Sequence, residues 1–197
     1  MEGILTIFIA GIFTDNFILT RFLGICPFLG VSKRVDTAVG MSLAVTVVMV
    51  LATVITYPLY AGVLVPLGLG YLQTIMFILI IAALVQLIEI FLRKYIPPLY
   101  NSLGVFLPLI TTNCAILGIV LLHFAHGHSY FESVMSALAT GAGFLLAMVM
   151  FAGVRSRIEG NDVPKALQGL PITLIAASIM SLSFMGFTGI AEGLFGR

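Results

Sequence analysis

Hydrophobic residues in this chain form blocks of about twenty residues separated by short polar stretches. Five blocks are long and apolar enough to cross a bilayer as helices, which requires about 20 residues. They are residues 38–57, 72–91, 99–122, 133–154 and 170–191. A sixth block, residues 4–31, is less regular because it contains Asp15, Arg21 and Pro27, so we expect a broken or bent span there. The pattern predicts an all-α membrane protein of six transmembrane helices.

The composition favours a single membrane domain spanning residues 1–197. Only 9% of the residues are charged and 60% are hydrophobic, whereas soluble domains carry about 25% charged residues. The net charge of +1 excludes the basic stripe that neutralises nucleic-acid phosphates. The first residues lack the basic region of a secretory signal, so we expect the first block to be retained as a span.

Lysine and arginine alternate between the loops that join the blocks. The first, third and fifth loops are basic, whereas the second and fourth, residues 62–70 and 123–131, contain no lysine or arginine. The basic residues are Lys33, Arg34, Arg93, Lys94, Arg155, Arg157 and Lys165. Because basic loops stay in the cytoplasm, this alternation predicts cytoplasmic loops one, three and five and both termini on the outer side.

The chain also contains a weak internal symmetry. Residues 23–30 align with residues 111–118 so that Cys26 falls opposite Cys114, and the two segments share Cys, Leu and Gly in register. Each cysteine lies in the first span of a three-span half, and an odd number of spans makes the halves inverted in the membrane. We therefore expect two inverted repeats, about residues 1–96 and 97–197, with the first helix of each broken near the functional site.

Both cysteines lie at predicted helix breaks. Cys26 stands between Gly24 and Pro27, and Cys114 follows a polar Thr-Thr-Asn run inside an apolar block. Three interpretations remain open: buried small hydrophobic residues, a disulfide between the halves, or ligands of a thiolate metal site. Two thiolates do not complete the four-ligand sets of zinc or of a 2Fe-2S cluster. A metal site would therefore need ligands from a second chain.

The segments around these cysteines resemble a known family. Residues 22–33 read FLGICPFLGVSK and residues 107–115 read LPLITTNCA. They are similar to the two signature segments of the paired membrane subunits of Rnf and Nqr complexes. These complexes are prokaryotic ion-translocating ferredoxin:NAD oxidoreductases and sodium-translocating NADH:quinone reductases. The resemblance extends over nearly the whole chain.

The resemblance implies a role in electron transport. Cys26 and Cys114 would be this chain's two ligands to an intramembrane 2Fe-2S cluster, and a homologous inverted-repeat subunit of the E type would supply two more cysteines. Electrons would pass between flavin-carrying subunits on the outer side and an iron-sulfur subunit in the cytoplasm, coupled to Na⁺ or H⁺ transport. The chain would be a non-autonomous translocase subunit of the prokaryotic inner membrane, with no catalytic residues of its own.

Glycines accompany both cysteine segments. We expect Gly24, Gly30 and Gly118 to let the backbone approach the sulfurs, with close helix packing as the alternative. The glycines of the segment 140–143 favour close packing of the fifth helix instead. The sequence contains no dinucleotide fingerprint, so we expect this subunit to bind no NAD by itself.

Other polar residues at membrane depth have two interpretations each. Glu89 and Arg93 are spaced for an ion pair on one helix face, with an ion-pathway role for Glu89 as the alternative. Asp15, Asn16 and Arg21 are expected to brace the first break or to contact a partner subunit. The outer-loop histidines, His123, His126 and His128, are spaced for metal binding, but exposed loop histidines commonly have no specific role.

The rival functional class is a small inverted-repeat secondary transporter without a redox centre. Its broken helices would bind a solute or an ion, and the two cysteines would be incidental.

Overall fold

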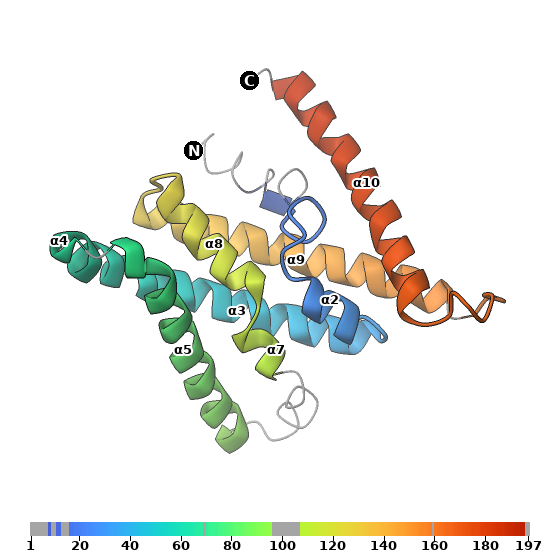
Figure 1. Cartoon of the computed structure of the whole chain (residues 1–197), viewed down its shortest axis with the longest axis horizontal. Helices are drawn as coiled ribbons and strands as arrows, with labels where there is room; N and C mark the ends of the chain where they lie inside the picture. Colours follow the sequence, from blue (N-terminus) through green and yellow to red (C-terminus); the bar gives the residue numbers. More distant parts are fainter. Residues whose placement is uncertain are drawn as a thin grey trace.

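The computed structural model describes residues 8, 11–12, 16–68, 70–95, 107–158 and 160–195. Within these ranges every regular element is helical and no strand is present (Figure 1). The elements are α2 (Ile25–Val31), α3 (Val35–Leu59), the π-helical turn η2 (Tyr60–Leu64), α4 (Val65–Leu67), the 3₁₀ turn η3 (Gly70–Leu72), α5 (Gln73–Tyr95), α7 (Leu107–Thr111), α8 (Cys114–Ala125), α9 (Tyr130–Ile158) and α10 (Leu170–Phe195).

Four helical stretches in the described part are long and apolar enough to cross a membrane. They are Val35–Leu64, Gly70–Tyr95, Pro108–Ala125 and Tyr130–Ile158. A shorter apolar stretch, Leu170–Gly186, begins α10. Four of the six expected spans are therefore confirmed as apolar helices. Nine of the 28 residues of the first expected span lie outside the described residues, and the count of six spans and the inverted repeats stay predictions.

Helices α3 and α9 form the centre of the molecule and lie side by side (Figure 1). Their shared core is built from fully buried apolar side chains such as Met49 and Met148. Gly141 lies so close to the Thr46 side chain that a Cβ atom at Gly141 would collide with it. A Cβ atom at Gly143 would lie 2.8 Å from the Gly11 carbonyl oxygen. The packing role expected for these α9 glycines is confirmed.

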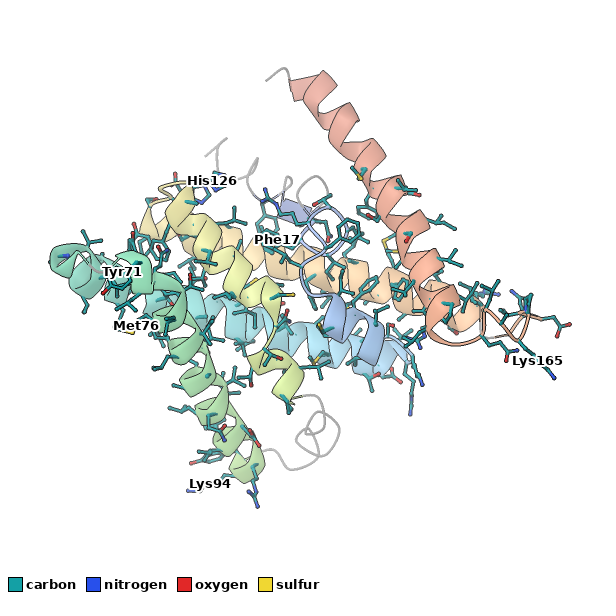
Figure 2. All side chains as sticks on the ribbon, viewed as in Figure 1. Phe17, Tyr71, Met76, Lys94, His126 and Lys165 are labelled. Carbon is teal, nitrogen blue, oxygen red and sulfur yellow. The ribbon has the colours of Figure 1, made fainter. Side chains whose placement is uncertain are left out.

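Helices α5 and α10 diverge from this centre and expose apolar side chains (Figures 1 and 2). Leu87 on α5 is 65% exposed and Leu182 on α10 is 69% exposed. Contiguous exposed apolar surface of this kind marks contact with lipid or with another protein. The surface agrees with a chain whose solvent is the bilayer.

Contacts between distant segments divide the loops into two groups. Arg155 at the end of α9 donates a hydrogen bond to the Leu29 carbonyl oxygen, which brings loops one and five together. At the other end, the Tyr57 hydroxyl donates to the His128 carbonyl oxygen at 3.2 Å. Figure 2 shows His126 and Lys165 far apart, His126 near the start of α9 and Lys165 past its other end. The separation agrees with the predicted alternation, and the end that faces the cytoplasm stays a prediction.

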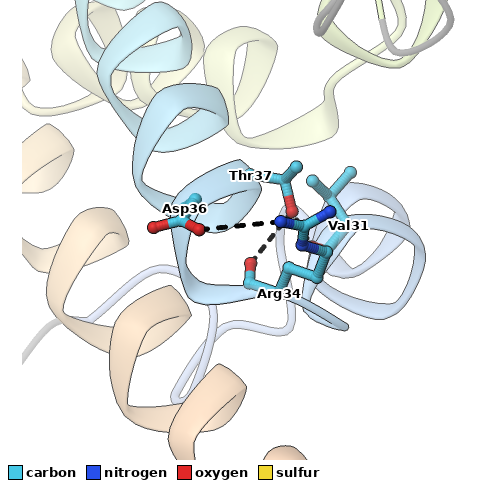
Figure 3. A network of polar contacts seen from close by, with 4 residues as sticks. All are labelled: Val31, Arg34, Asp36 and Thr37. Carbon is cyan, nitrogen blue, oxygen red and sulfur yellow. Dashed lines mark hydrogen bonds and ion pairs between the residues drawn. The ribbon is translucent and has the colours of Figure 1, made fainter.

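The turn from α2 into α3 is held by local polar contacts (Figure 3). The Thr37 hydroxyl donates to the carbonyl oxygens of Arg34, at 2.9 Å, and Val31, at 3.3 Å. Arg34 also forms an exposed ion pair with Asp36 at 3.9 Å. Asp36 lies in the first turn of α3, where a negative charge interacts favourably with the helix dipole.

Candidate functional site

The fourth predicted span is broken immediately before Cys114. Helix α7 ends at Thr111, and α8 begins at Cys114. Asn113 between them has extended backbone angles, and its side-chain oxygen accepts a hydrogen bond from the Ala115 N–H at 3.0 Å. Asn113 is thus the N-cap of α8, which satisfies one of the amides that a helix start leaves unpaired. The expected break in this span is confirmed.

The break near Cys26 lies before the cysteine. Phe22 and Gly24 have left-handed backbone angles, with φ of 56° and 89°, and α2 begins at Ile25. Pro27 lies in the first turn of α2, where the missing proline N–H breaks no helical hydrogen bond. Both cysteines therefore lie in the first turn of a helix, immediately after a break.

One hydrogen bond joins the two breaks directly. The Gly24 N–H donates to the Cys114 Sγ, with a nitrogen to sulfur distance of 2.9 Å. A side chain at Gly24 would be strained by its positive φ, and its Cβ atom would lie 2.8 Å from Phe144 Cε2. Gly24 therefore brings backbone to a sulfur, as the sequence predicted.

The other two glycines of the motif act differently. A Cβ atom at Gly118 would lie 2.8 Å from Leu23 Cδ1, so Gly118 allows close packing of the broken segment on α8. A Cβ atom at Gly30 would meet Leu109 Cδ2 only at 3.5 Å, an ordinary contact distance. The structure thus supports the sulfur-approach hypothesis at Gly24 and the packing alternative at Gly118.

The exposure of the cysteines separates the interpretations that the sequence left open. Cys26 is exposed, Cys114 is half-buried, and both are free thiols. The disulfide interpretation is therefore wrong for this structure, and burial as a small hydrophobic residue does not describe Cys26. A thiol at the surface of the chain is available to a second protein or to a shared ligand.

The surroundings of the cysteines fit one half of a thiolate cluster site. Besides the Gly24 N–H, the Asn113 amide nitrogen Nδ2 is buried and has no hydrogen-bond partner. An unpaired buried N–H costs free energy unless an acceptor is present, and cluster sulfurs are such acceptors. Within the described part of the chain, no three His, Cys, Asp or Glu side chains are grouped to hold a metal. The chain's contribution would be the two thiols.

Asn16 braces the first broken segment from inside the protein. Its side chain is fully buried, and Nδ2 donates to the carbonyl oxygens of Gly143, at 2.9 Å, and Ile12, at 3.2 Å. Its Oδ1 accepts from the Ile18 N–H at 3.2 Å. The bracing role expected for Asn16 is confirmed. Arg21 is exposed with its guanidinium 5.8 Å from the Phe17 ring centroid, and Asp15 lies outside the described residues.

Arg155 contacts the Cys26 segment, although its place in the sequence predicts only a basic residue of the fifth loop. It is 8% exposed, and its Nη1 donates to the Leu29 carbonyl oxygen at 2.8 Å and to the Ser32 Oγ at 3.0 Å. A signal for this burial exists in the sequence. Arg155 continues the helical stripe of the buried residues Met148 and Phe151, at spacings of seven and four residues.

The histidines cluster at the opposite end of α8. The ring centroids of His123 and His128 are 5.9 Å apart, and those of His126 and His128 are 5.6 Å apart. All three line a cavity of about 230 Å³ together with Ser136 and Thr140. The arrangement does not provide a metal site, so the metal-binding alternative gains no support. His123 is nonetheless unusual, because it is 2% exposed and both ring nitrogens lack a partner.

The ion pair expected between Glu89 and Arg93 is not formed by these described side chains. Glu89 is only partly exposed, and the one ion pair between described residues joins Arg34 and Asp36. Both residues lie on α5, and their spacing of four residues would permit an ion pair. Helix α5 diverges from the centre of the molecule (Figure 1).

Comparison with known proteins gives a consistent set of relatives. Residues 4–191 match the family described as "Rnf-Nqr subunit, membrane protein". The chain is 56% identical to the A subunit of the Na(+)-translocating ferredoxin:NAD(+) oxidoreductase complex of Acetobacterium woodii, over 95% of this chain and 97% of that protein. It is 52% identical to the A subunit of the ion-translocating oxidoreductase complex of Syntrophotalea carbinolica, over 98% of this chain and 100% of that protein. The corresponding protein of Yersinia enterocolitica is 48% identical over the same shares.

Proposed function

The chain belongs to the Rnf-Nqr family of membrane subunits, and we propose that it serves as the A-type subunit of an ion-translocating oxidoreductase complex of the Rnf kind. Family membership confirms the resemblance that the two cysteine segments indicated. The relatives match along their full length and are all named as subunits of a larger complex. The chain is accordingly a non-autonomous part of a translocase. The alternative of an independent secondary transporter is not favoured.

Within this complex the chain would hold half of an intramembrane 2Fe-2S cluster through Cys26 and Cys114. The observation that carries this proposal is the 2.9 Å hydrogen bond from the Gly24 N–H to the Cys114 Sγ, because it joins the two cysteine segments at a sulfur. When bound, such a cluster accepts and releases single electrons. The Gly24 N–H would stabilise negative charge on Cys114, and Asn113, the residue before Cys114, has a buried Nδ2 donor without a partner.

The other two ligands would come from a homologous membrane subunit of the E type. The exposure of Cys26 supports this, since a thiol at the protein surface in a membrane is placed to meet a neighbouring chain. The exposed apolar faces of α5 and α10 supply further surface for lipid or for other subunits. Flavin-carrying and iron-sulfur subunits would deliver and remove the electrons.

Electron transfer through this chain would be coupled to transport of Na⁺ or H⁺ across the prokaryotic inner membrane. The names of the relatives support ion coupling, and that of the Acetobacterium woodii protein specifies Na⁺. The orientation with loops one, three and five in the cytoplasm follows from their lysine and arginine residues.

Metal and sulfide analysis of the purified complex tests the proposal. Replacement of Cys26 or Cys114 by serine should remove one 2Fe-2S signal from the electron paramagnetic resonance spectrum and stop electron transfer through the membrane subunits. Ser183→Ala is a control, since Ser183 is exposed on α10 and donates only to its own helix. A complex that contains no such cluster, or keeps it in both cysteine variants, would exclude the cluster role and leave the transporter alternative.

A further inference from the structure

The C-terminal end of α2 is held by a buried cation from another helix. Arg155 on α9 donates from Nη1 to the Leu29 carbonyl oxygen at 2.8 Å and to the Ser32 Oγ at 3.0 Å. Leu29 lies in the last turn of α2, where the carbonyl oxygens have no N–H donor within the helix. A cation at this end also interacts favourably with the helix dipole. Arg155 therefore caps the helix that carries Cys26.

Helix α2 depends on such contacts for its position. It has seven residues, and isolated helices of this length are not stable. Its start has no side-chain cap and is attached to α8 through the Gly24 N–H and the Cys114 Sγ. Its body packs on α9 through the Phe28 and Phe151 rings, whose centroids are 4.0 Å apart. Two ends and one face are thus fixed by other helices.

The Arg155 contact lies close to the cysteine along the helix axis. Cys26 precedes Leu29 by three residues, which corresponds to roughly 4.5 Å of helix rise. A short helix held at both ends moves as a unit, so a shift of its C-terminal end also displaces or rotates the cysteine. The buried guanidinium is costly to keep in a membrane protein, which favours a specific role for it over a passive one.

We propose that Arg155 is a positioning residue that fixes the Cys26 thiol relative to Cys114 by anchoring the C-terminal end of α2. The consequence of this positioning for a cluster rests on the proposed function, in which Cys26 and Cys114 form half of the cluster site. Arginine suits this task better than lysine, because its planar group directs N–H donors at two fixed acceptors at once. Replacement should therefore alter the site even where the complex still assembles.

The variants Arg155→Met and Arg155→Lys test the proposal, with Arg157→Met as the matched control. Arg157 lies on the same helix, carries the same charge and is exposed. In the assembled complex, Arg155→Met should shift the resonance lines and the midpoint potential of the cluster that depends on Cys26. Arg155→Lys should restore part of the difference, and Arg157→Met should leave both quantities unchanged. Wild-type lines and potential in Arg155→Met would overturn the proposal.

A second measurement does not require the cluster. In complex from which iron has been removed, the rate of maleimide reaction at Cys26 should change on the order of threefold to tenfold in Arg155→Met, as expected from the loss of one or two hydrogen bonds. The rate at Cys114 should change less. If the wild-type complex contains no cluster that depends on Cys26 and Cys114, the proposed function fails, but the Cys26 rate still decides whether Arg155 positions the thiol. An unchanged rate would contradict the positioning role.

If the Arg155→Met complex does not assemble, a milder variant tests whether Arg155 positions the Cys26 thiol. Ser32→Ala removes one acceptor of Arg155 from a fully buried position while the charge stays in place. It should shift the Cys26 rate and the resonance lines in the same direction as Arg155→Lys, by a smaller amount. Wild-type values for both quantities in Ser32→Ala and in Arg155→Lys would overturn the proposal.

Discussion

The two cysteine segments reach a similar local arrangement by different means. Cys114 begins a twelve-residue helix whose start is capped by its own neighbour, Asn113. Cys26 lies in a seven-residue helix that has no side-chain cap and begins after the left-handed Gly24. The start of the Cys114 helix is capped by its neighbour in sequence, whereas both ends of the Cys26 helix are held by contacts from α8 and α9. We therefore expect substitutions to affect the Cys26 segment through distant residues and the Cys114 segment through its cap.

The largest effect is expected for Gly24→Val. The new side chain would hold a positive φ that costs roughly 1–2 kcal/mol, and its Cβ would collide with Phe144 at an added cost of roughly 1–3 kcal/mol. The hydrogen bond to Cys114 would be lost with the shift of the backbone. The thermal unfolding temperature and the iron content of the purified complex should both fall.

Gly30→Ala is the control for that substitution. Gly30 lies in α2, the helix that Gly24 precedes, and it is exposed; its Cβ would meet only one side chain at an ordinary distance. Its effect on unfolding should stay within about 0.5 kcal/mol. Equal losses in the two variants would show that α2 tolerates no substitution at all, and the special role of Gly24 would have to be abandoned.

A smaller loss is expected for Gly118→Ala, which tests packing between the two segments. The added methyl group would lie 2.8 Å from Leu23 Cδ1, and overpacking of this kind costs about 1–3 kcal/mol. The double variant with Leu23→Ala should regain part of the stability, because the colliding methyl group is removed. Cluster potential should change little in either. A large shift of potential with unchanged stability would instead favour an approach of Gly118 to the sulfurs.

The cap of α8 separates two roles of one side chain. Asn113→Ala should destabilise the complex by about 0.5–2 kcal/mol through loss of the hydrogen bond to the Ala115 N–H. Asn113→Asp keeps that acceptor but replaces the buried, unpaired Nδ2 with negative charge. It should therefore retain the cluster less well than Asn113→Ala does. Better retention in the aspartate variant would exclude a donor role for Nδ2.

The break before Cys114 could be predicted from the sequence, whereas the supports of Cys26 could not. Asn113 follows two threonines inside an apolar block, and each of these residue types favours a helix start or a turn. The α9 glycines likewise indicated close packing by themselves. Arg155 was different, because its position next to the basic loop residues concealed its place on the buried stripe of α9. Its partners are more than 120 residues away in the sequence, and only the tertiary fold brings them together.

The position of the break in the first segment shows the same limit. Gly24 and Pro27 indicated a helix break around Cys26 without giving its side, and the structure places the break before the cysteine, with Pro27 within the first turn of α2. Proline is accepted at a helix start as readily as it ends one, so the residue alone does not give the direction. The left-handed angles of Phe22 and Gly24 decide it, and a positive φ at phenylalanine has no sequence signal.

The smallest effect on stability is expected for His123→Leu, near the C-terminal end of α8, because the buried His123 imidazole is unfavourable there. Both ring nitrogens of His123 are buried without a partner, and an apolar side chain of similar size removes that cost. His123→Leu should leave the free energy of unfolding unchanged or raise it by up to about 1 kcal/mol, with cluster content as in the wild type. His126→Leu, at an exposed position in the same cluster, serves as the comparison. A loss of about 2 kcal/mol or more in His123→Leu alone would mean that the imidazole has a bound partner in the adjoining cavity, and α8 would then depend on a ligand just as α2 depends on its neighbours.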